Sequence, residues 1–192
     1  SLVVGVAFAA WLSIVTGITH LDGVADVGDA AVVHGDADRR REALKDSALG
    51  VGGTVALALV VVGLVAAGAA VADVATRSLA DAVALVVLAE VGAKAATAAL
   101  VCLGDAPHEG LGSALTAASG PRALAGVALV TTPATLAGGS VLGAGGAGVV
   151  AGVFTAAIVV AALAFAWARS RLGGVSGDVL GATNEIARVV GL

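Results

Sequence analysis

The 24 residues from 49 to 72, LGVGGTVALALVVVGLVAAGAAVA, contain no charged side chain and consist almost entirely of Val, Leu, Ala and Gly. A helix of about 20 apolar residues is long enough to cross about 30 Å of hydrocarbon. Over all 192 residues, 59% are hydrophobic and 12% are charged, whereas a soluble domain has about a quarter charged residues. The chain is therefore predicted to be an integral membrane protein.

Long apolar runs recur on both sides of this stretch. They cover about 1–19, 80–103, 123–142 and 147–168, so with 49–72 they make five candidate spans. We expect an all-α, polytopic helical bundle of about five to six transmembrane helices, with residues 1–192 in a single membrane-embedded domain. The glycine-rich run 143–148 fits a dinucleotide-binding pattern, but no strand precedes it, and we predict a turn between two helices.

The basic residues predict the orientation in the membrane, because Lys and Arg accumulate in cytoplasmic loops. Most of them fall in the segments 20–47, 104–122 and 169–192, which then share one face: Arg39, Arg40, Arg41, Lys45, Arg122, Arg169, Arg171 and Arg188. The other face receives only Arg77. We expect a multi-pass protein of the cytoplasmic membrane with these three segments in the cytoplasm. The net charge of −4 leaves no basic surface for nucleic acid.

The densest polar stretch is HLDGVADVGD, residues 20–29, directly after the first span. In a helix, Asp22, Asp26 and Asp29 lie on one face, where like charges repel unless a cation neutralises them. Carboxylate oxygens suit Mg²⁺, which binds through a few carboxylates together with substrate phosphates. The stretch therefore indicates either a magnesium site or an acidic helix end in water.

Other polar residues offer further candidates. Lys45 precedes a glycine-rich helix start, where backbone N–H groups can bind an anion. Glu90 and Lys94 share a helix face inside a span, either as a neutralising pair or as a phosphate contact, and a transporter would place such a pair there too. His108 and Glu109 are adjacent in a loop, and glycines surround Asp178.

Taken together, these motifs resemble the cobalamin synthase family, the adenosylcobinamide-GDP ribazoletransferases. The stretch TGITHLDGVADVGD, residues 16–29, is similar to the signature of that family. The similarity continues at Lys45-Asp46-Ser47, at EGLG in 109–112, and at Gly173-Gly174 and Gly177-Asp178. Members usually carry an additional N-terminal segment with a basic, proline-containing motif, which we expect this chain to lack.

The resemblance implies a Mg²⁺-dependent transferase. Such an enzyme joins α-ribazole, or its 5′-phosphate, to adenosylcobinamide-GDP, releases GMP and forms adenosylcobalamin or its 5′-phosphate. The metal ligands would be Asp22, Asp26 and Asp29, which count with His20 and Lys45 as catalytic residues. Substrate contacts would come from Asp46, Ser47, Lys94, Glu109 and Asp178. His20 or one of the aspartates would be the base, and Lys45 and Lys94 would contact phosphate.

Two alternative functions stay open on the sequence alone. Membrane CDP-alcohol phosphotransferases also begin an acidic metal motif with D-G-x-x-A, but this chain departs from their motif at Asp26. A small secondary transporter would instead use Glu90 and Lys94 at mid-membrane.

Overall fold

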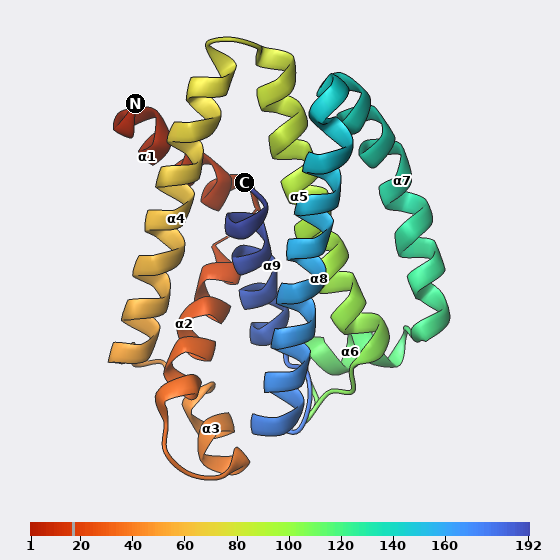
Figure 1. The fold of residues 1–192 in the computed structure, drawn as a ribbon. Helices are drawn as coiled ribbons and strands as arrows, with labels where there is room; N and C mark the ends of the chain where they lie inside the picture. Colours follow the sequence, from red (N-terminus) through yellow and green to blue (C-terminus); the bar gives the residue numbers. More distant parts are fainter. Residues whose placement is uncertain (17) are drawn as a thin grey trace.

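The computed structural model describes residues 1–16 and 18–192, and within them the chain is α-helical with no strand (Figure 1). The α-helices are α1 (Leu2–Thr16), α2 (Thr19–Val32), α3 (Ala37–Ala43), α4 (Val51–Ala75), α5 (Leu79–Leu103), α6 (Leu111–Ala117), α7 (Leu124–Val141), α8 (Gly146–Arg171) and α9 (Gly177–Gly191). Short 3₁₀ turns, η1 (Pro121–Ala123) and η2 (Gly143–Gly145), precede α7 and α8. The turn predicted at 143–148 is thus η2 and the start of α8.

Four helices are long and apolar enough to cross a membrane. They are α4, α5, α7 together with η1, and α8 together with η2, which confirms four of the five predicted spans to within a few residues. The fifth differs, because α1 has 15 residues and reaches the required length only with α2, whose axis is turned by 99°. The described residues thus form an all-α polytopic bundle with four spans, or five if this bent pair counts as one.

The long helices alternate in direction and bring the longer connections to one end (Figure 1). Residues 33–50, 104–123 and 172–176 lie at this end, which we call the loop end, whereas the short connections 76–78 and 142–145 lie at the other. This grouping of three distant segments on one face is the arrangement predicted from the basic residues.

The C-terminal segment corrects one prediction. Residues 169–192 were expected in the cytoplasm, but 177–191 form α9, which runs through the middle of the bundle between α2, α5 and α8 (Figure 1). Arg188, predicted at the cytoplasmic face, is 1% exposed within the bundle. The low hydropathy of α9 is compatible with this place because its polar side chains find partners on neighbouring helices.

Two glycines allow α2 and α9 to pack closely. A Cβ at Gly23 would lie 2.7 Å from the carbonyl oxygen of Asp178, and one at Gly181 would lie 3.2 Å from the Cα of His20. Real Cβ atoms do not approach backbone as closely as the first distance. The glycine within the motif HLDGVAD therefore brings the start of α9 against the polar face of α2.

Candidate functional site

Two polar pockets open at the loop end. The lysine pocket has a volume of about 330 Å³ and lies between Asp22 and Asp26 of α2 and the connection 44–49. The histidine pocket, of about 430 Å³, is lined by His20, Asp22 and Asp178, with Thr97, His108 and Ser176 among its other residues. Because Asp22 lines both pockets, they form one adjoining polar site built from α2, α5, α6, α9 and three connections.

Asp26 shows how the carboxylates of this site affect each other. It lies in the acidic half of α2, beyond the predicted span 1–19. Its partial burial, and then the carboxylates of Asp22, Asp178 and Asp29, raise the pKa of Asp26 to about 6. None of the ion pairs among the described residues includes Asp22, Asp26 or Asp178. A bound cation would relieve this repulsion.

The third aspartate of the motif has a different partner. Asp29 accepts hydrogen bonds from the backbone N–H groups of Gly50 at 2.8 Å and Gly53 at 2.9 Å. The glycine-rich start of α4 thus binds an anion, as its composition suggested, but that anion is a carboxylate of the chain itself. Asp29 lines neither polar pocket, and its role as a metal ligand stays a prediction.

The donor chemistry around Asp22 and Asp26 fits Mg²⁺ in combination with a phosphate substrate. In the part of the chain that the structure describes, no three His, Cys, Asp or Glu side chains are grouped to hold a metal by themselves. Mg²⁺ rarely needs such a cage, because it commonly binds through one or two carboxylates, waters and substrate phosphates. Asp22 and Asp26 in one pocket, with Asp178 near enough to affect Asp26, supply that kind of donor set.

The remaining predicted residues divide between the site and its surroundings. Lys45, Asp46 and Ser47 line the lysine pocket, and Asp178 lines the histidine pocket with Ser176, whose Oγ donates to Asp178 Oδ2 at 3.3 Å. Glu109 is exposed and lines neither pocket. Gly112, from the same segment as Glu109, does line the histidine pocket. The structure thus brings together residues from all four segments that carry the family resemblance.

Inside the bundle, Glu90 and Lys94 have separate partners on α9. Arg188 donates from Nη2 to Glu90 Oε2 at 3.1 Å, and from Nη1 to both carboxylate oxygens of Glu185 at 2.7 and 2.6 Å. Lys94 donates to the Oδ1 of Asn184 at 2.8 Å. The predicted Glu90–Lys94 pair is therefore replaced by two contacts between α5 and α9, and Lys94 lines neither polar pocket.

These α9 partners, Asn184, Glu185 and Arg188, were not predicted from the sequence as a unit. The expected cytoplasmic position of 169–192 would place these residues in water, where they need no partners. Their spacing was the available signal, because residues 184, 185 and 188 fall on one helix face. Asn184, Glu185 and Arg188 are each at most 2% exposed.

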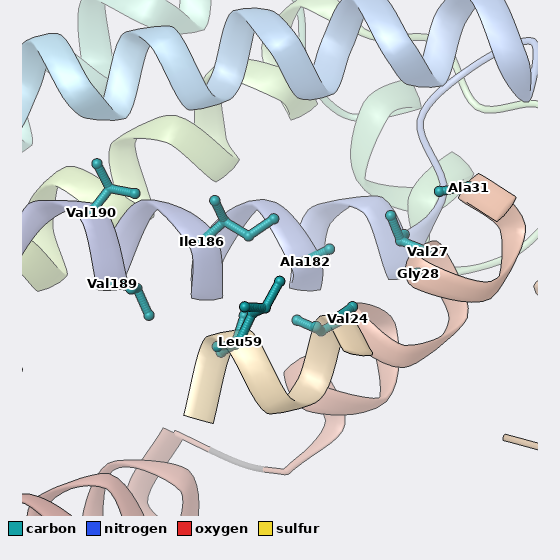
Figure 2. A pocket seen from close by; sticks show the side chains of 11 residues that line it. Val24, Val27, Gly28, Ala31, Leu59, Ala182, Ile186, Val189 and Val190 are labelled. Carbon is teal, nitrogen blue, oxygen red and sulfur yellow. The ribbon is translucent and has the colours of Figure 1, made fainter. Parts of the chain in front are cut away.

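A third pocket, of about 330 Å³, contrasts with the polar ones (Figure 2). It lies between α2, α4 and α9, and Figure 2 shows Val24, Leu59, Ile186 and Val189 around it. All eleven of its lining residues are Val, Leu, Ile, Ala or Gly. This pocket has no charged or hydrogen-bonding side chain that could stabilise a phosphate group, whereas the two polar pockets at the loop end do.

The fold and the site define a class: a polytopic helical membrane protein with adjoining polar pockets, rich in carboxylates, at one end of its bundle. The family model described as cobalamin-5-phosphate synthase matches residues 1–192, the full length of the chain. The chain belongs to this family.

Curated relatives support the same assignment. A protein of Halorubrum lacusprofundi named adenosylcobinamide-GDP ribazoletransferase is 56% identical, over 98% of this chain and 74% of the relative. A protein of Halobacterium salinarum with the same name is 50% identical over 98% of this chain and 90% of its own length. A third with this name, from Methanococcoides burtonii, is 32% identical over 99% of this chain and 69% of the relative. No solved structure matches the chain significantly.

Proposed function

We propose that the chain catalyses the reaction after which these relatives are named. A ribose hydroxyl of α-ribazole, or of its 5′-phosphate, attacks the cobinamide-side phosphorus of adenosylcobinamide-GDP. The new O–P bond forms as the P–O bond to the guanosine phosphate breaks, so GMP leaves and the hydroxyl proton is taken up at the site. The observation that carries the proposal is the set of carboxylates without ion-pair partners around Asp22, beside Lys45 and His20.

Phosphoryl transfer asks a protein mainly to position the reactants and to neutralise charge. Asp22 and Asp26, with Asp178 near them, would hold Mg²⁺, which when bound neutralises charge on the diphosphate. Lys45 and Ser47 line the same pocket as Asp22 and Asp26, and their ammonium and hydroxyl groups would bind the phosphates. His20, in the adjoining pocket, is the candidate acceptor for the hydroxyl proton.

The arrangement of basic residues supports a cytoplasmic position for the site. The loop end carries Arg39, Arg40, Arg41, Lys45, Arg122, Arg169 and Arg171, and Arg77 lies at the opposite end. With Arg188 counted as buried, the asymmetry still follows the positive-inside rule. We therefore place the protein in the cytoplasmic membrane, surrounded by lipid, with the loop end facing cytoplasmic substrates and no nucleic acid partner.

The experiment that tests this function uses the full-length protein reconstituted into lipid vesicles. Adenosylcobinamide-GDP and α-ribazole, or its 5′-phosphate, are supplied with Mg²⁺ or with EDTA, and GMP and the corrinoid product are separated by chromatography. We expect both products in equal amounts, only when protein and Mg²⁺ are present. Folded, inserted protein that yields neither product would refute the assignment, and equal rates in EDTA would refute the Mg²⁺ requirement.

Two controls separate the alternatives within the same preparation. A CDP-alcohol phosphotransferase would release CMP from a CDP-alcohol donor, so we expect no CMP from such a donor. A transporter would move substrate into the vesicles without GMP release. Because Glu90 is bound by Arg188, we expect no uptake that depends on Glu90 and Lys94.

A further inference from the structure

Four ionisable side chains form a continuous path through the bundle from α2 through α9 to α5. His20 Nδ1 lies 3.2 Å from Glu185 Oε1. Arg188 donates from Nη1 to both carboxylate oxygens of Glu185 and from Nη2 to Glu90 Oε2. Glu185 is 2% exposed and Arg188 is 1% exposed. The proposed function uses only His20, at the end of this path, and leaves the other three without a role.

Glu185 determines which nitrogen of His20 carries the proton. A carboxylate that a guanidinium binds through both oxygens offers only acceptors. Nδ1 of His20 must then donate to Glu185, which leaves Nε2 of the neutral ring as an acceptor. Asn184 Nδ2 lies 3.3 Å from Nδ1, but it is itself a donor and bonds to Glu185 Oε1 at 3.1 Å. A bare Nδ1 could accept from Asn184, but its lone pair would then lie 3.2 Å from an oxygen of the Glu185 carboxylate, so the contact with Glu185 favours the Nδ1–H form.

The imidazole ring connects this buried path to the reaction site. The side chain of His20 is 29% exposed, against 3% for Glu185, and it lines the histidine pocket with Asp22 and Asp178. Gly181 packs beside the ring, where a Cβ would lie 3.6 Å from His20 Cδ2. One ring nitrogen is therefore fixed by the interior of the bundle while the ring remains part of the pocket wall.

We propose that Glu185 is a positioning residue for His20. It holds the imidazole as the Nδ1–H tautomer, so that Nε2 accepts a hydrogen bond from the attacking hydroxyl, and Arg188 holds the Glu185 side chain in place. A histidine oriented by a buried carboxylate behind it recurs in unrelated hydrolases for the same reason. This inference rests on the proposed function for its kinetic consequence, although the tautomer itself does not.

The first test is spectroscopic and needs no activity. Protein with ¹⁵N in its imidazole rings is prepared in a His34→Gln, His108→Gln background, so that His20 gives the only histidine signals. We expect nitrogen shifts of the Nδ1–H tautomer in vesicles at alkaline pH. A spectrum of the Nε2–H tautomer, the usual form of a free neutral imidazole, would overturn the proposal.

The second test is kinetic. Glu185→Leu should lower kcat by about 10- to 100-fold with KM changed less than about threefold, and Glu185→Gln, which keeps an acceptor oxygen, should recover most of the loss. In a His20→Ala background, Glu185→Leu should change kcat less than about threefold, because its effect passes through the ring. An equal loss in both backgrounds would show a merely structural role and overturn the proposal.

Glu90→Gln is the matched control, because it removes a carboxylate from the same guanidinium and leaves the Glu185–His20 contact in place. We expect kcat per folded protein to fall less than about threefold. A loss equal to that of Glu185→Leu would contradict the positioning role. If Glu185→Leu does not fold, the tautomer of His20 in protein that keeps Glu185 decides the question. If the wild-type protein yields no GMP, the proposed function fails, while the spectrum still reports on the Glu185–His20 contact.

Discussion

The molecule holds two groups of charged side chains that are arranged in opposite ways. In the bundle network, which comprises His20, Glu90, Glu185 and Arg188, carboxylates flank a guanidinium. In the acidic group, which comprises Asp22, Asp26 and Asp178, carboxylates affect one another and raise the pKa of Asp26. In the network each carboxylate is paired with the guanidinium of Arg188, whereas the acidic group contains no cation and leaves its negative charge for something else to neutralise.

Burial explains the difference. An unpaired charge at membrane depth is costly, so ionisable residues there pair with one another. Asp22 is exposed and Asp26 and Asp178 are only partly buried, so water at the loop end can stabilise their charge in the absence of a ligand. A fold therefore tolerates like charges where it is open to solvent, and that is also where a charged substrate can enter.

The largest expected effect comes from removing the central cation of the bundle network. Arg188→Gln leaves Glu90 and Glu185 buried without their partner, and breaking a buried ion pair in this way costs about 3–5 kcal/mol. We expect a marked loss of folded protein and a lower Tm in detergent, measured by size-exclusion chromatography and thermal unfolding. The triple variant that adds Glu90→Gln and Glu185→Gln should recover part of the lost stability. An unchanged Tm in Arg188→Gln alone would show that the network does not stabilise the fold.

The acidic group should respond in the opposite sense. Asp22→Asn is expected to lower the rate of GMP release at least about 100-fold, because it weakens charge neutralisation on the substrate phosphates. Stability should be kept or slightly increased, since one of the like charges beside Asp26 is removed. Asp73→Asn at the opposite end of the bundle is the matched control. Full activity of the Asp22 variant would refute its place in the site.

The membrane spans and the acidic group could largely be predicted from the sequence, whereas the bundle network could not. Apolar runs of sufficient length predicted the spans that became α4, α5, α7 and α8, because length and hydropathy are local properties. The motif spacing likewise predicted that Asp22 and Asp26 share a helix face. The distribution of Lys and Arg predicted the topology, and this topology placed Lys45 on the same face of the membrane as Asp22 and Asp26.

The bundle network could not be predicted in the same way, because its contacts depend on packing between helices far apart in sequence. Helix α9 has mixed polarity and 15 residues, which is typical of a surface helix, and only its neighbours make its interior position favourable. The partner of Asp29 was missed for the same reason: nothing local distinguishes an aspartate that binds a cation from one that binds the start of another helix.

Asp29 offers a smaller effect that sharpens the boundary between the two groups. Asp29→Asn replaces one acceptor oxygen at the start of α4 with a donor, and losing such a cap costs about 0.5–2 kcal/mol. If Asp29 serves α4 alone, the Tm falls while GMP release per folded protein stays within about tenfold of wild type. If it also binds Mg²⁺, as the motif predicts, the rate falls about as far as in the Asp22 variant. Activity and thermal unfolding measured on one preparation distinguish the two roles.

The smallest effect is a pH dependence of stability that originates in Asp26. Its pKa of about 6 in the folded protein lies above the usual value of 3.8, so the folded state binds this proton more tightly than the unfolded state. The resulting stability is fully present below about pH 4 and is lost as the pH rises through about 6. In EDTA, the Tm of the wild type should therefore fall relative to that of Asp26→Asn as the pH rises from about 4 to about 7. Saturating Mg²⁺ should reduce this change, because a cation stabilises the deprotonated carboxylate. A Tm difference that stays constant between pH 4 and 7 in EDTA would show that the neighbouring carboxylates do not act on Asp26.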